Sequence, residues 1–221
     1  MTQDFESFWG WPGWRHLRYA CLLSLVGTLW FLLIYDGANA LTALRTYRVR
    51  IHLDAELGIP LIPELIVVYW SIYLLFLAAP FVLRQRRELF AFSITLNLAI
   101  LVGGFCFLLF PAGSAFASSG DLGVWAGMFR LTKQLNLDYN MVPSLHVALS
   151  TICIAVFAGR ASRTGKVLLW TWAVAISVST LLTHQHHILD VVTGFVLALA
   201  AFKFIYLRFD HERTMTFNRS A

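Results

Sequence analysis

The run LFAFSITLNLAILVGGFCFLLF, residues 89–110, contains no charged side chain. A spanning helix needs about 20 mostly apolar residues, so this run is long enough to cross a bilayer. Arg86 and Arg87 precede it, and a polar, glycine-rich stretch begins at Pro111. Basic residues on one side and a chain breaker on the other mark both ends of a predicted transmembrane helix.

Five further apolar runs satisfy the same criterion. The chain is 58% hydrophobic and 13% charged, with a mean hydropathy of +0.68, which is too apolar for a soluble domain. We therefore expect an all-α integral membrane protein, a six-transmembrane-helix bundle that forms a single membrane domain over residues 1–221. The six predicted spans are Leu17–Tyr35, Pro63–Leu83, Leu89–Phe110, Val142–Gly159, Val167–Thr183 and Ile188–Leu207.

The orientation follows from the distribution of Lys and Arg on the two sides of a six-span arrangement. One side holds twelve of the seventeen: Arg15, Arg18, Arg84, Arg86, Arg87, Arg160, Arg163, Lys166, Lys203, Arg208, Arg213 and Arg219. The other side holds five: Arg45, Arg48, Arg50, Arg130 and Lys133. We expect an inner (plasma) membrane protein with both termini cytoplasmic and with the connections after the first, third and fifth spans outside. The net charge of +5 is explained by this topology, so we expect no nucleic-acid partner.

Two features near the first span leave alternatives open. Leu41, Leu44, Tyr47 and Ile51 recur at helical spacing, which fits a helix lying in the membrane interface, but a solvated connector fits equally well. Ala38-Asn39-Ala40 has the small-x-small pattern of a signal cleavage site. We favour an uncleaved anchor, because the apolar run is longer than a usual signal core.

Ionisable residues at membrane depth are costly and often mark function. His186 and Asp190 are four residues apart, so they lie on one helix face if the last span begins near Gln185. The carboxylate can then accept a hydrogen bond from one ring nitrogen and leave the other as a lone pair. This arrangement is typical of an oriented histidine nucleophile.

A second group of polar residues opens the fourth span, at the same predicted outer face. His146 lies one turn into this span and can act as a general acid toward a departing alkoxide. Ser144 and the free N–H groups of the helix start can bind an anion. Each feature alone has a plainer interpretation: a helix cap, a structural ion pair or a satisfied histidine. Together they predict a catalytic site.

Pro143-Ser144-Leu145-His146 and Ser179-(six residues)-His186-(three residues)-Asp190 resemble the second and third motifs of the type 2 phosphatidic acid phosphatase superfamily. The stretches Tyr139–Ala148 and His186–Gly194, with Ile59–Pro63 near the second span, are similar to the branch that includes inositol phosphorylceramide synthase and sphingomyelin synthase. The likeness runs from about residue 53 to residue 206.

The resemblance implies a six-helix bundle with a metal-independent, cofactor-free site at one membrane face. It assigns His186 as nucleophile, Asp190 as its orienting partner and His146 as acid, with a phosphohistidine intermediate. The superfamily's first motif, a Lys followed by Arg-Pro, is missing, and Thr180 stands where an Arg is expected. We expect Ser144, Arg130, Lys133 and His184 to bind the substrate phosphate instead.

Three interpretations of function remain. We place a lipid phosphate phosphatase first, with a lipid phosphotransferase that moves a phospho-headgroup to a lipid hydroxyl second. A metal-binding transport protein is the alternative of another class, because His146, His184, His186, His187 and Asp190 could collect zinc. The expected partners are a lipid phosphate substrate and membrane lipids; the sequence does not indicate the oligomeric state.

Overall fold

The computed structural model describes residues 11–116 and 121–209, and this part of the chain is helical with no β-strand. The helices are α1 (Trp14–Ala43), α2 (Ile66–Trp70), α3 (Ile72–Val82), α4 (Arg86–Leu109), α5 (Ala126–Leu135), α6 (Leu145–Ala158), α7 (Arg163–Leu182) and α8 (Ile188–Ala201). A π-helical turn, Phe202–Tyr206, extends α8, and short 3₁₀ turns occur at Asp54–Gly58, Pro63–Leu65 and Gly123–Trp125. The expected all-α membrane fold is confirmed at this level.

Five segments of the described chain are long and apolar enough to cross a membrane: Trp14–Ala43, Pro63–Val82, Arg86–Leu109, Arg163–Leu182 and Ile188–Phe209. The sixth predicted span is represented by α6, which has only 14 residues and is not among the five. The count of six spanning helices is therefore not confirmed. The predicted span starts at Val142, whereas α6 has Ser144 as its N-cap, begins at Leu145 and ends at Ala158.

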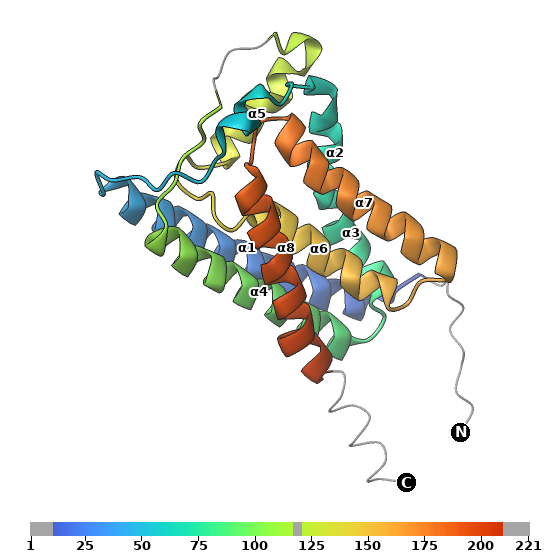
Figure 1. The fold of residues 1–221 in the computed structure, drawn as a ribbon. Helices are drawn as coiled ribbons and strands as arrows, with labels where there is room; N and C mark the ends of the chain where they lie inside the picture. The colour runs from blue at the N-terminus through green and yellow to red at the C-terminus, as the bar shows by residue number, and fades with distance from the viewer. Residues whose placement is uncertain (1–10, 117–120, 210–221) are drawn as a thin grey trace, which may run out of the picture.

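The short α6 is the centre of the bundle (Figure 1). All of its residues except His146 are buried, and it packs against α3, α4, α7 and α8. Outer helices must face lipid with a continuous apolar surface, whereas a helix wrapped by protein need not span the whole hydrocarbon core. The length of α6 is thus consistent with its central position.

The connections between the helices gather at two opposite faces. The connections after α1, α4 and α7 share one face, because Glu56 contacts His187 and His187 contacts Ala115. At the other face, Arg160 at the end of α6 pairs with Glu88 at a distance of 3.1 Å. Of the basic residues used for the orientation, Arg213 and Arg219 lie outside the described residues.

The two features near the first span have different outcomes. Residues 46–53 are not helical, so the interfacial helix is wrong and the connector interpretation holds. Val49 donates to the Pro111 carbonyl at 2.8 Å and Ile51 is buried, so this segment is bound to the connection after α4 instead of forming a helix. α1 continues through Ala38 to Ala43 without a break.

Candidate active site

His186 and Asp190 make the contact that their spacing predicts. The distance from His186 Nδ1 to Asp190 Oδ2 is 2.6 Å, and Asp190 is completely buried. A carboxylate accepts here, so Nδ1–H donates and Nε2 is left with its lone pair. His186 itself is 7% exposed, and it lines a large, partly open cavity.

The backbone brings His186 to this position in an unexpected way. α8 begins at Ile188, so His186 lies in the connection before it rather than on the helix. The N–H groups of Gln185 and His186 both bond to the Thr180 carbonyl at the end of α7. His184 has a positive φ of 57°, an uncommon conformation for a residue with a side chain. A tight turn after α7 therefore directs His186 toward Asp190.

His187 follows His186 directly in the chain but makes different contacts. Its Nε2 accepts from the Ala115 N–H at 3.1 Å, and its Nδ1 donates to Glu56 Oε2 at 3.1 Å. Both ring nitrogens are thus occupied and the ring is fully buried. His187 joins three connections of the bundle and has no free nitrogen for a substrate or a metal.

Glu56 is a residue of the site that sequence reasoning missed. Its carboxylate also accepts from the Ile188 N–H at 3.0 Å, at the start of α8, and from the Leu53 N–H at 3.2 Å. Burial alone raises the pKa of Glu56, but the hydrogen bonds from Ile188, Leu53 and His187 outweigh it and lower the pKa overall. Glu56 therefore caps α8 as an anion, next to the connection that carries His186.

The same network acts on His187. Burial lowers the pKa of His187, and the negative charges of Asp190 and Glu56 offset this effect only in part. The ring is thus held neutral with its proton on Nδ1, because Nε2 must accept from a backbone N–H. In the sequence, Glu56 is an acidic residue in a predicted outer connection and belongs to no motif. Nothing in its spacing indicates a contact with a histidine 131 positions away.

His146 faces the same cavity as His186. Its ring stacks on Tyr69 with a centroid distance of 3.8 Å, and its Nε2 donates to the Tyr69 carbonyl at 2.8 Å. Because a carbonyl can only accept, Nε2 carries a proton and Nδ1 is the nitrogen left for chemistry. The predicted pair of imidazoles is therefore brought to one cavity, each with one nitrogen unused by the protein.

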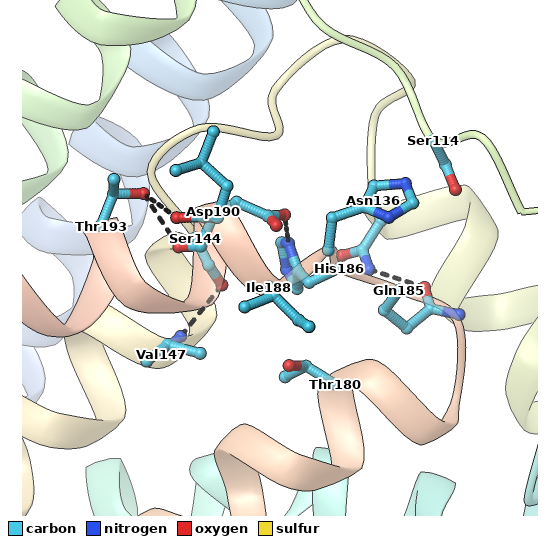
Figure 2. A network of polar contacts seen from close by, with 12 residues as sticks. Ser114, Asn136, Ser144, Val147, Thr180, Gln185, His186, Ile188, Asp190 and Thr193 are labelled. Carbon is cyan, nitrogen blue, oxygen red and sulfur yellow. Dashed lines mark hydrogen bonds and ion pairs between the residues drawn. The ribbon is translucent and has the colours of Figure 1, made fainter. Parts of the chain in front are cut away.

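Ser144 has the plainer of its two predicted roles. Its hydroxyl accepts from the Val147 N–H at 3.2 Å and caps α6, and the residue is fully buried. Its own N–H donates to the Asp190 carbonyl at 2.9 Å. Figure 2 shows the Ser144–Val147 contact and the His186–Asp190 pair. The N–H groups of Leu145 and His146, which both line the cavity, have no partner within the described part of the chain.

The start of α6 is pressed against α8. A Cβ added to Gly194 would lie 2.5 Å from the Ser144 carbonyl oxygen. Such a distance is too short for any side chain, so glycine allows the close approach that brings Ser144 to Asp190. This contact fixes the helix that carries His146 relative to the residue that orients His186.

The predicted cationic ligands are not brought to the histidines. Arg130 and Lys133 are exposed on α5, and neither lines the cavity. His184 donates to the Ile59 carbonyl at 2.9 Å and stacks on Phe116, so it is a hydrogen-bonded neighbour. Thr180, where an Arg was expected, is buried and donates to Ser177. Amides occupy the cavity wall instead: Asn136 donates to the Tyr69 hydroxyl at 2.7 Å and Asn140 to the Tyr35 carbonyl at 2.6 Å.

The candidate zinc ligands do not form a metal site. Within residues 11–116 and 121–209, no group of three or more His, Cys, Asp or Glu side chains is arranged to hold a metal ion. His187 uses both nitrogens and His184 turns toward Ile59. The geometry therefore gives the metal-transport interpretation no support.

The fold and the site together define an all-helical membrane protein with a carboxylate-oriented histidine and a second histidine at one internal cavity. A family model described as PAP2 superfamily matches residues 64–204. The chain therefore belongs to the PAP2 superfamily, the type 2 phosphatidic acid phosphatases that the motifs resemble. This membership indicates phosphatase-type activity on lipid phosphates. The comparison with curated proteins finds no match.

Proposed function

We propose that the protein is a lipid phosphate phosphatase that works through a phosphohistidine on His186. The observation that carries the proposal is the His186–Asp190 pair, with Nδ1 held at 2.6 Å from the carboxylate and the ring lining a cavity shared with His146. In each imidazole, one ring nitrogen makes a hydrogen bond, and the other has no partner within the described part of the chain. Two such nitrogens at one cavity suit a nucleophile and a proton carrier.

In the first step, the Nε2 lone pair of His186 attacks phosphorus and the bond from phosphorus to the lipid oxygen breaks. Doubly protonated His146 gives its Nδ1 proton to the departing alkoxide, which leaves as a lipid alcohol. Asp190 stabilises the positive charge that develops on the His186 ring. Burial of the ring and the neighbouring His186 disfavour a doubly protonated His146, so this step depends on the bound anionic phosphate to stabilise that form.

In the second step, His146 is neutral and its Nδ1 is a base. It takes a proton from water while the water oxygen attacks phosphorus and the P–N bond breaks. Inorganic phosphate leaves, and His186 regains its lone pair. The hydrogen bond from Nε2 of His146 to the Tyr69 carbonyl keeps the same nitrogen directed to the site in both steps.

Charge on the phosphoryl group requires donors. The N–H groups of Leu145 and His146 at the start of α6 suit this role, because the helix dipole favours an anion there. Asn140 adds an amide group to the same cavity, with one of its two N–H groups on the Tyr35 carbonyl; Asn136 donates to Tyr69 and Gln185 and shapes the wall instead. We propose that Arg130 and Lys133 attract an anionic headgroup at longer range from α5, while Ser144 and His184 hold the backbone around the phosphate.

The proposed location is the inner (plasma) membrane, with both termini cytoplasmic and the site facing outward. The support is the distribution of basic residues, twelve against five of seventeen, together with the gathering of the outer connections at one face.

One observation favours transfer to a lipid hydroxyl as a second candidate. Residues 132–140 form a roof segment over the two histidines. It is bound to α2 through Trp70 and Thr132 at 2.8 Å, and to α1 through Asn140 and Tyr35 at 2.6 Å. A roof restricts water at His186, which lengthens the life of a phosphohistidine and gives a lipid alcohol time to react.

The proposal is tested with purified protein and a panel of lipid phosphates, with and without added diacylglycerol or ceramide. Free phosphate identifies hydrolysis, and a new phospholipid identifies transfer. His186→Gln should reduce both to background and abolish an acid-labile, alkali-stable phosphoprotein. His16→Gln, the same exchange at the opposite face, is the control. Full turnover by His186→Gln, or activity that depends on added divalent metal, would overturn the phosphohistidine mechanism.

A further inference from the structure

The cavity at the two histidines continues deep into the bundle. It has a volume of about 1080 Å³, at the upper end of the range for ligand pockets. Its walls come from α1, α3 and α4, with the outer end of α6 at the back, and they are mostly apolar. We call this space the chamber.

The roof segment closes the chamber toward the outer face. Its far end is fixed to α1 twice, by Asn140 on the Tyr35 carbonyl and by the Tyr139 N–H on Asn39 Oδ1 at 3.2 Å. Its near end is fixed to α2, where Asn136 bonds to Tyr69. The phosphate-bearing end of a ligand under this roof lies at His146 and His186.

The chamber opens sideways, between α1 and α3. α1 packs along α4 but meets α3 at few points. Trp11, which precedes α1, contacts Phe81 of α3 at the inner end, with a centroid distance of 5.5 Å. Above that contact, Leu32 of α1 and Leu77 of α3 both line the chamber and are 45% and 68% exposed, so the open side of the chamber lies between these two helices. A lipid can therefore move in from the bilayer without leaving the hydrocarbon.

The depth of the chamber exceeds what an outer-leaflet chain needs. α6 has 14 residues, or about 21 Å, against a hydrocarbon core of about 30 Å. With the inner end of α6 at the Arg160 boundary, His146 is recessed within the outer half of the membrane. The wall formed by α2 and α3 continues from Tyr69 to Pro80, about 16 Å further down, which passes the midplane.

Gly27 marks the lower part of the chamber. It lines the α1 wall, twelve residues below Asn39 and seven above Ala20. A Cβ at Gly27 would meet only Asn97 Oδ1, at an ordinary 3.5 Å. By contrast, a Cβ at Gly104 in the α1–α4 contact would lie 2.3 Å from Ile34. Helix packing therefore requires Gly104, whereas Gly27 keeps space open inside the chamber.

We propose that the chamber binds the hydrocarbon chain of the substrate, that it takes a chain long enough to cross the bilayer midplane, and that Gly27 sets the accepted length. The inference rests on the proposed function, because the phosphate at His186 fixes where the chain begins. Its occupant is a lipid with one long chain that slides in between α1 and α3, phosphate toward the roof.

Phosphate release is measured on octyl, dodecyl, hexadecyl and docosyl phosphate with wild type, Gly27→Phe and Gly37→Phe. Gly37 is the control, because a Cβ there meets nothing within 4 Å and it does not line the chamber. We expect Gly27→Phe to lower the ratio of docosyl to octyl kcat/KM about tenfold, since the added ring occupies space that only the longer chain needs. Gly37→Phe should leave this ratio unchanged.

A docosyl phosphate with a diazirine at the end of its chain gives a readout that needs no turnover. In His186→Gln protein, we expect crosslinks at the lower chamber, around Ala20, Pro80 and Leu89. Crosslinks confined to the outer lipid-facing surface, or an unchanged chain-length ratio in Gly27→Phe, would overturn the chamber assignment. Absence of phosphate release by wild type on every substrate would instead overturn the proposed function.

Discussion

Glu56→Gln tests whether a residue in the first outer connection positions the nucleophile. The wild-type carboxylate accepts three hydrogen bonds, from Leu53, His187 and Ile188, at 3.2, 3.1 and 3.0 Å. A glutamine has one acceptor oxygen and one NH₂ group, so at least one donor then faces another donor. His187 cannot relieve this by moving its proton, because the Ala115 N–H occupies its other nitrogen.

The size of the effect follows from these contacts. Each buried polar group left without a partner costs about 1–3 kcal/mol, so we expect Glu56→Gln to lower the free energy of unfolding by about 3 kcal/mol. For a chain of this length, that corresponds to a fall in Tm of about 6–12 °C. The start of α8 should shift with it, and kcat should fall about tenfold to a hundredfold with little change in KM, because a small misplacement of a nucleophile is costly.

The assay is thermal unfolding in detergent together with phosphate release. Asp54→Asn is the matched control, since Asp54 is a nearby carboxylate whose side chain is 84% exposed and pairs only with Arg50. An exposed pair contributes about 0–1 kcal/mol, so this variant should match wild type. If Glu56→Gln melts and turns over like Asp54→Asn, the reasoning that Glu56 positions His186 is refuted.

The same network sets a pH dependence of stability. The pKa values of Glu56 and His187 are lowered in the folded state from ordinary values of 4.5 and 6.5. The unfolded chain therefore binds more protons, and stability should fall as the pH drops from about 7 toward 4. In Glu56→Gln, the part of this fall below about pH 5 should be smaller, as measured by Tm across a pH series.

Two further substitutions test the helix contact and the proton carrier. Gly194→Ala forces a Cβ against the Ser144 carbonyl at 2.5 Å, so we expect a loss of about 1–3 kcal/mol in thermal unfolding; Gly37→Ala, with open space around it, should be neutral, and equal melting of the two would contradict the close contact. His146→Gln can still donate to the Tyr69 carbonyl but carries no titratable proton, so kcat should fall about 10²–10⁴-fold. A wild-type kcat and pH profile in His146→Gln would remove His146 from the mechanism.

The sequence predicted the parts of this fold that depend on local composition. Charge-free runs such as residues 89–110 must form helices, because lipid offers no partner for the backbone. The pairing of His186 with Asp190 was predictable from a spacing of four residues, although His186 precedes α8 rather than belonging to it. A spacing of four residues brings these two side chains together whether His186 lies on the helix or just before it.

The parts that depend on contacts between distant segments were not predictable. Leu41, Leu44, Tyr47 and Ile51 recur at helical spacing, yet Val49 bonds to Pro111 and residues 46–53 are not helical. Glu56 carries no motif, and its role appears only when three connections meet at His187. Arg130 was predicted as a phosphate ligand only because its connection lies on the same predicted membrane face as the histidines. That reasoning could not distinguish the exposed side of α5, which carries Arg130, from the side that lines the chamber.

The shortness of α6 links this protein to the physical state of its membrane. Lipid does not touch the buried central helix, so a thicker bilayer can change the tilt of the outer helices but cannot lengthen α6. In such a membrane the substrate headgroup must move further below the membrane surface to reach His186. In a thinner membrane this distance is smaller. Turnover measured in vesicles made from lipids of increasing acyl-chain length should therefore fall as the hydrophobic mismatch grows. The reaction rate would then depend on bilayer thickness.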